Sequence, residues 1–139
     1  MRQDFIERRI TQGAPAHATA DAIGLATAQA FRLLLSELEP LVGTQAVRAL
    51  YARSLHLTRT SFDWLSAAAA QPQDELLVLL HSNLASRMPA DARLAGQALL
   101  LCFADLLISL IGEPLTYRLL RSAWEPPAAA DQPSPEKAQ

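Results

Sequence analysis

The residues with the most chemical potential are three histidines, one cysteine and one aspartate within an apolar stretch. His17, His56 and His81 lie far apart in the chain, and none is within helical reach of a second histidine or a cysteine. A zinc site needs several such ligands at short, matched spacings. The sequence therefore predicts no metal site and no cofactor.

Motifs for catalysis are missing from the sequence. It contains no glycine-rich phosphate loop, no nucleophile elbow and no recognisable arrangement of a cysteine with a histidine. Members of a catalytic triad need not be neighbours in sequence, so this absence weakens an enzymatic interpretation without excluding it. We expect a protein that is not an enzyme.

Cys102 is the only cysteine, which rules out an intramolecular disulfide and fits a reducing compartment. The first ten residues are charged, and no apolar signal core with a cleavage site follows them. We expect a cytoplasmic protein.

The overall charge favours neither nucleic acid nor an anionic membrane, because 12 basic and 14 acidic residues give a net charge of -2. The segment 44–60, however, contains no acidic residue. Its cationic side chains are expected on the face opposite the apolar one. These residues are Arg48, Arg53, His56 and Arg59. We predict that they bind acidic groups of a protein partner. The alternative is an ordinary solvated face.

The segment 94–111 is apolar nearly all the way round and is long enough to cross a bilayer. Asp105 in its middle would cost about 3 kcal/mol on membrane insertion. Amphipathic segments surround it, which is typical of a buried core helix. We therefore predict no membrane span.

Asp105 shares a stripe of small or polar side chains with Cys102 and Ser109, at spacings of three and four residues. An ionised carboxylate in the core must be paired, hydrogen-bonded or neutralised. Arg118 is one of its candidate partners. We interpret Asp105, Cys102, Ser109 and Arg118 as polar residues of the core or of a pocket between helices.

Apolar residues at three- and four-residue spacings predict the elements that position these side chains. Pro40 is expected to end the first helix, Thr44 to cap the second and Gly112 to end the fourth. A short helical turn is expected within 61–70. The fold class is all-α, a single-domain bundle of about five helices around a central apolar helix (94–111); the predicted helices are about 20–39, 44–60, 74–88, 89–111 and 115–124.

Residues 1–18 are expected to form an arm or a short helix, 19–124 the bundle, and 125–139 a disordered Pro/Ala-rich tail. The central helix has more apolar faces than a thin bundle covers, so it is either a private core or a dimer interface. We predict a small helical protein-interaction or regulatory module that forms a homodimer. The alternative is a binding protein for an apolar small molecule near Asp105.

Overall fold

A computed structural model of the chain describes residues 2–15, 17–65 and 73–124. These residues form helices and connecting turns and contain no strand, which confirms the predicted all-α bundle. The helices are α1 (Arg2–Gly13), α2 (Ala20–Val42), α3 (Thr44–Thr58), α4 (Gln73–Ala85), α5 (Pro89–Ile111) and α6 (Glu113–Trp124). Of the turn expected within 61–70, residues 61–65 form turns, with the Leu65 N–H donating to the Phe62 carbonyl (3.1 Å). The rest of that segment, 66–70, and the expected tail, 125–139, lie outside the described residues.

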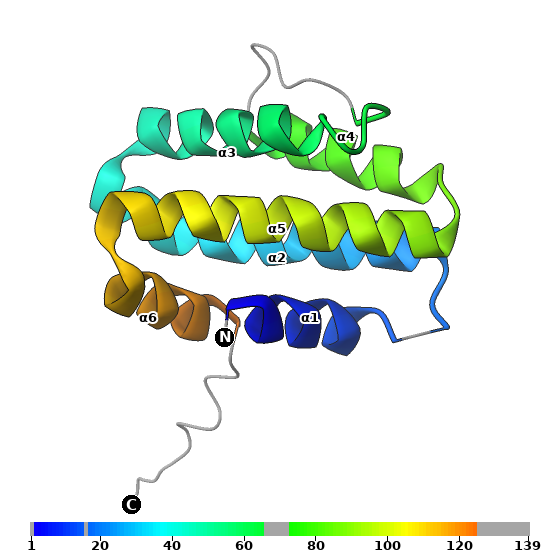
Figure 1. The fold of residues 1–139 in the computed structure, drawn as a ribbon, viewed down its shortest axis with the longest axis horizontal. Coiled ribbons are helices and arrows are strands. Elements are labelled where there is room, and N and C mark those ends of the chain that lie inside the picture. The colour runs from blue at the N-terminus through cyan, green and yellow to red at the C-terminus, as the bar shows by residue number, and fades with distance from the viewer. Residues whose placement is uncertain (1, 16, 66–72, 125–139) are drawn as a thin grey trace, which may run out of the picture.

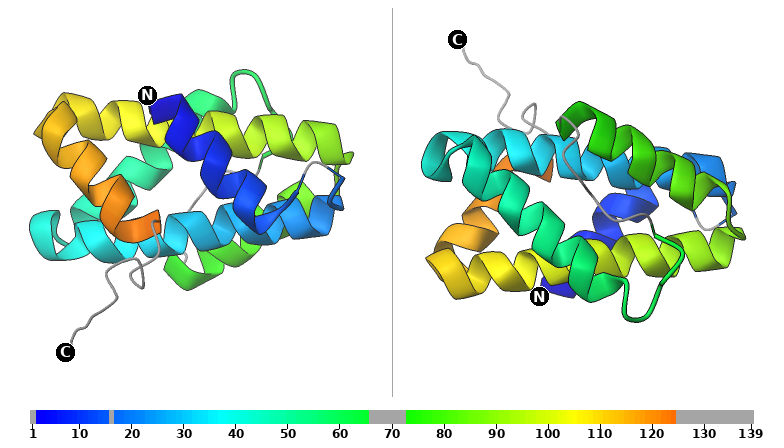
Figure 2. Two further views of the ribbon diagram at one scale, coloured as in Figure 1. Left: turned by 90° about the horizontal axis from the view of Figure 1, so that it is seen from below. Right: turned by 90° about the horizontal axis from the view of Figure 1, so that it is seen from above.

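The helices form three layers, with α3 and α4 above, α2 and α5 in the middle, and α1 and α6 below (Figure 1). In that view α5 lies in front of α2, and the views from below and above show the outer helices crossing this pair (Figure 2). Both α2 and α5 contact each of the other helices. The predicted central apolar helix, α5, therefore shares the middle of the bundle with α2.

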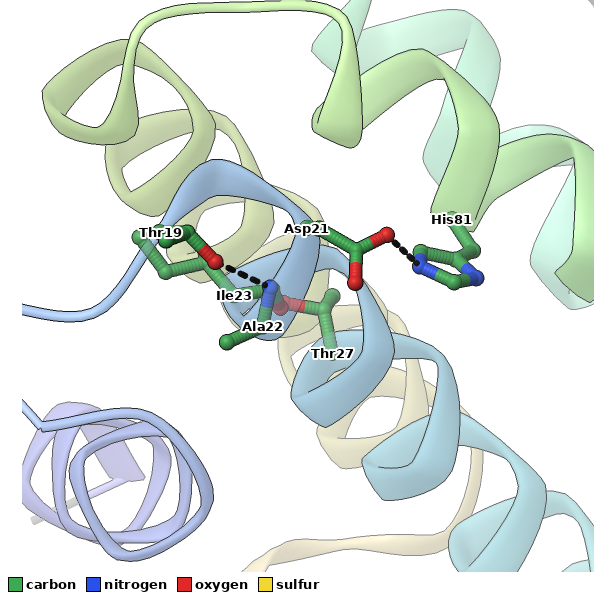
Figure 3. A network of polar contacts seen from close by, with 6 residues as sticks. All are labelled: Thr19, Asp21, Ala22, Ile23, Thr27 and His81. Carbon is green, nitrogen blue, oxygen red and sulfur yellow. Dashed lines mark hydrogen bonds and ion pairs between the residues drawn. The ribbon is translucent and has the colours of Figure 1, made fainter.

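Small residues let the helices approach α2 closely. A Cβ atom on Gly96 of α5 would lie 2.7 Å from Oγ1 of Thr27, and one on Gly24 would lie 2.9 Å from the carbonyl oxygen of His81. Both distances are shorter than van der Waals contact. The Thr27 hydroxyl donates to the carbonyl of Ile23 in its own helix (2.8 Å), which holds it in place (Figure 3). Glycine is therefore the residue that fits these two crossings without displacing a neighbour.

Aromatic side chains join α2, α3 and α5 in the core. Phe31 is fully buried and meets Tyr51 and Phe103 edge to face, with ring centroids 5.2 and 5.6 Å apart. Such pairs contribute about 0.5–1.5 kcal/mol each beyond their buried area. The indole N–H of Trp124 in α6 donates to the backbone carbonyl of Ala30 in α2 (3.0 Å). These contacts fix the two middle helices against their neighbours.

The helix predicted over about 20–39 corresponds to α2 and ends later than predicted. Pro40 lies inside α2, which continues to Val42. A proline in the last turn removes only one backbone hydrogen bond, whereas Gly43, with φ of +90°, takes the chain out of the helix. Thr44 is the first residue of α3 rather than its cap, and its hydroxyl donates to the Glu39 carboxylate.

Residues near the N-terminus form α1, which packs on α2 and α5. Ile6 and Ile10 of this helix are buried in the core. The guanidinium of Arg93 in α5 donates to the backbone carbonyls of Ala14 and Pro15, at 2.8 and 2.7 Å. These bonds attach the end of α1 to the start of α5.

Candidate interaction surface

The most apolar helix of the chain is only partly buried. The most apolar window of α5 has a mean hydropathy of 2.1, and 39% of that window is buried inside the bundle. By length and composition alone this helix is able to cross a membrane. Its inner side carries the fully buried Leu99, Phe103 and Leu107. Its outer side faces the viewer in Figure 1.

Five residues define what we call the open face of α5. At 100° per residue they fall within about 80° of one another around the helix. Leu94 is 57% exposed, Asp105 is exposed, and the other three are half-buried. Among the described helices, none lies between α5 and the viewer in Figure 1. Its members are Leu94, Gln97, Leu101, Asp105 and Ile108.

A hollow of about 180 Å³ lies between α1 and the open face. Ile6 and Glu7 line it from α1, and Leu94, Gln97 and Leu101 are among its lining residues from α5. Pockets that hold drug-sized ligands usually measure about 300–1,000 Å³. The hollow is therefore small for a ligand site and extends the open face toward α1.

On the opposite border, toward α3, Cys102 is half-buried among polar residues. Burial raises the pKa of its thiol, the hydrogen bond with the Thr58 side chain lowers it, the negative charge of Asp105 raises it and the positive charge of Arg53 lowers it. The net direction is upward, so the thiol is neutral at neutral pH and is not an activated nucleophile. Both Arg53 and Asp105 are therefore near enough to Cys102 for their charges to act on the thiol.

The prediction that Asp105 belongs to the core is wrong, because its side chain is exposed. Ser109 and Arg118 are exposed as well, and of the four predicted polar residues only Cys102 is partly buried. The stripe that holds Asp105, Cys102 and Ser109 is the outer side of α5, because the opposite, wholly apolar side packs into the core. The carboxylate takes the outer side, where water solvates it and no burial cost arises.

The four cations predicted to bind a partner differ in exposure. Arg53 and His56 are exposed, whereas Arg48 and Arg59 are half-buried. The Nε of Arg59 donates to the carbonyl of Leu65 (2.8 Å) and so holds the turn that follows α3. Arg48 and Arg53 are about 140° apart around the helix. Arg53 and His56 are the two that stay exposed, and Arg53 lies at the border with α5.

A histidine that sequence reasoning left unused links two helices. Nε2 of His81 in α4 lies 2.9 Å from a carboxylate oxygen of Asp21 in the first turn of α2 (Figure 3). Within the described ranges, no three His, Cys, Asp or Glu side chains come together as a metal site. The contact is a surface link between helices. Its partners are 60 residues apart, and no sequence spacing indicates such a pair.

Comparison of the chain with protein-family models, with curated proteins and with solved structures found no match.

Proposed function

We propose that this chain is a small helical protein-interaction module that works as a homodimer, with the open face of α5 as the interface. The observation that carries the proposal is the uncovered apolar surface on the most apolar helix. Leu94 is 57% exposed, and Leu101 and Ile108 follow it at seven-residue intervals. Contiguous exposed apolar surface marks interaction sites in soluble proteins.

A second copy of the chain fits this surface. Residues at seven-residue intervals return to nearly the same side of a helix, which is the pattern of paired helices. A twofold interface uses each residue of the face twice, so a short apolar row on one chain becomes a double row in the dimer. Full burial of one leucine side chain contributes about 1.5–3 kcal/mol relative to full exposure.

The borders of the face suit the rim of an interface, which is usually polar. Arg53 on α3 is exposed at one border, and Glu7 of α1 lies on the other border. Binding of acidic partner groups by Arg48, Arg53, His56 and Arg59 stays a prediction. Such binding is compatible with the proposed dimer.

Two other occupants of the open face are less well supported. A small apolar ligand would have to fit a hollow of about 180 Å³. Insertion into a membrane would bury Asp105 and would separate α5 from the helices that pack on it. Both become outcomes of the experiment.

The test is the molar mass from light scattering, with helicity from circular dichroism as the control for folding. We expect twice the 15.1 kDa chain mass for the wild type. Leu94→Glu and Leu101→Glu should give folded monomers, because each places a carboxylate in the interface. Val78→Glu is the matched control, since Val78 on α4 is 59% exposed, and this variant should stay a dimer.

A wild-type monomer would overturn the proposal. So would a dimer that Leu94→Glu leaves intact, because another surface would then form the contact. Wild-type protein that sediments with phosphatidylcholine vesicles and does not dimerise would make a lipid surface the occupant. A co-purified apolar ligand in native mass spectrometry, with a monomeric protein, would favour the small-molecule alternative.

A further inference from the structure

We infer that the two chains pair through antiparallel α5 helices, with the twofold axis passing beside Leu101. This inference rests on the proposed homodimer and adds its geometry and register. It predicts which residues of the two chains face each other. The basis is the order of residues along the open face.

The apolar and polar residues of the open face are arranged almost symmetrically on the two sides of Leu101. Leu94 lies seven residues before Leu101 and Ile108 seven residues after it. Gln97 lies four residues before Leu101 and Asp105 four residues after it. In an antiparallel pair centred on Leu101, each residue faces the one at the same distance on the other side of the centre. Apolar residues then meet apolar residues, and polar residues meet polar residues.

The two polar residues are complementary in this arrangement. The side-chain amide of Gln97 carries two N–H donors, and the carboxylate of Asp105 only accepts. A carboxylate has about four acceptor sites, so Asp105 can bind the partner's Gln97 in addition to the contacts within its own chain. The symmetry produces this hydrogen bond twice. Because the acceptor is charged, the bond is stronger than one between neutral groups.

A parallel pair lacks this match. It would place Asp105 opposite the partner's Asp105, so two like charges would face each other across the interface. It would also place Gln97 opposite Gln97. Only the antiparallel order pairs each donor with a charged acceptor.

The antiparallel order also covers the hollow beside α1. The partner's Ile108 faces Leu94, which lines that hollow together with Ile6 and Gln97. An apolar side chain thus covers its Leu94 end. The hollow then belongs to the interface and is not a separate site.

Disulfide cross-linking of single cysteines, introduced on a Cys102→Ser background, tests which residues of the two chains face each other. Two α-carbons must lie within about 7 Å to form a disulfide. In the antiparallel pair, Leu101→Cys faces itself and should cross-link on mild oxidation. Two copies of Leu94→Cys would be about 21 Å apart along the helices and should not cross-link alone. A mixture of Leu94→Cys with Ile108→Cys should yield a covalent dimer on a non-reducing gel.

Charge variants of Gln97 give an independent readout without cysteines. Gln97→Lys should tighten the dimer and Gln97→Glu should weaken it, each by about two- to fivefold in the dimer dissociation constant, because the substituted group faces the Asp105 carboxylate of the partner. In a parallel pair both variants would place like charges opposite each other, and both would weaken the dimer.

The outcomes separate this inference from the proposed function. A dimer in which Leu94→Cys cross-links alone, or in which Gln97→Lys weakens association, overturns the antiparallel order and leaves the homodimer standing. A wild-type monomer overturns both. Cross-links from Leu101→Cys and from the mixed pair, without one from Leu94→Cys alone, support both.

Discussion

Replacing Gly96 by alanine tests how closely α5 approaches α2. The added Cβ would lie 2.7 Å from Oγ1 and 3.3 Å from Cγ2 of Thr27, which is fully buried and hydrogen-bonded to its own helix. Overpacking of this kind costs about 1–3 kcal/mol. Alanine regains about 1 kcal/mol through its higher helix propensity. We therefore expect a net loss of about 1 kcal/mol in the free energy of unfolding.

A double-mutant cycle isolates the contact. Thr27→Ala removes both nearby atoms and leaves only the Cβ of residue 27, 3.5 Å from the new methyl group. In that background Gly96→Ala should stabilise the protein by about 1 kcal/mol, so the two changes should couple by about 1–3 kcal/mol. Thr27→Val is the control because it keeps the shape of the side chain, and Gly96→Ala should still destabilise that variant.

The assay is urea unfolding followed by circular dichroism at one fixed protein concentration, since association shifts apparent stability. The reasoning is refuted if Gly96→Ala and Thr27→Ala are additive. It is also refuted if Gly96→Ala stabilises the wild type, because α5 would then stand further from α2 than the structure shows.

Two predictions concern pH. The raised pKa of Cys102 makes alkylation by iodoacetamide slow at neutral pH and faster as the pH rises. Asp105→Asn should speed the reaction, because it removes a charge that raises the pKa, and Arg53→Ala should slow it. The opposite order would contradict the effects of these two charges on the thiol. Burial raises the pKa of Tyr51, because the folded protein favours the neutral phenol. The contribution of buried Tyr51 to the free energy of unfolding is therefore fully present below about pH 10 and is lost as the pH rises beyond that value. In urea unfolding, the free energy of unfolding should fall less between neutral and alkaline pH for Tyr51→Phe than for the wild type. An equal fall in both proteins would contradict the role given to Tyr51.

The amphipathic parts of the bundle were predictable from sequence. In the last helix, the three- and four-residue spacing of apolar side chains indicates four inward-facing residues, Leu115, Leu119, Leu120 and Trp124. The last three are buried and Leu115 is half-buried. The start of α5 at Pro89 and its end before Gly112 also agree with the prediction. Local chemistry determines these features, so a single sequence contains them.

The orientation of α5 differs from the prediction, and the candidate site changes with it. The helix is so apolar that its polar stripe is predicted to lie in the core or in a pocket between helices, whereas Asp105 in that stripe is exposed. The end of α2 differs from the prediction because Gly43, with its positive φ, ends the helix and Pro40 in the last turn does not. The link from Asp21 to His81 joins residues distant in sequence, and only the packing of α2 against α4 brings them together.

Sedimentation equilibrium of the wild-type protein over a wide concentration range tests the central claim most directly. The homodimer predicts a mass that approaches twice 15.1 kDa as the concentration rises. A mass of 15.1 kDa at every concentration would show that the open face of α5 does not bind a second copy, and would contradict the account.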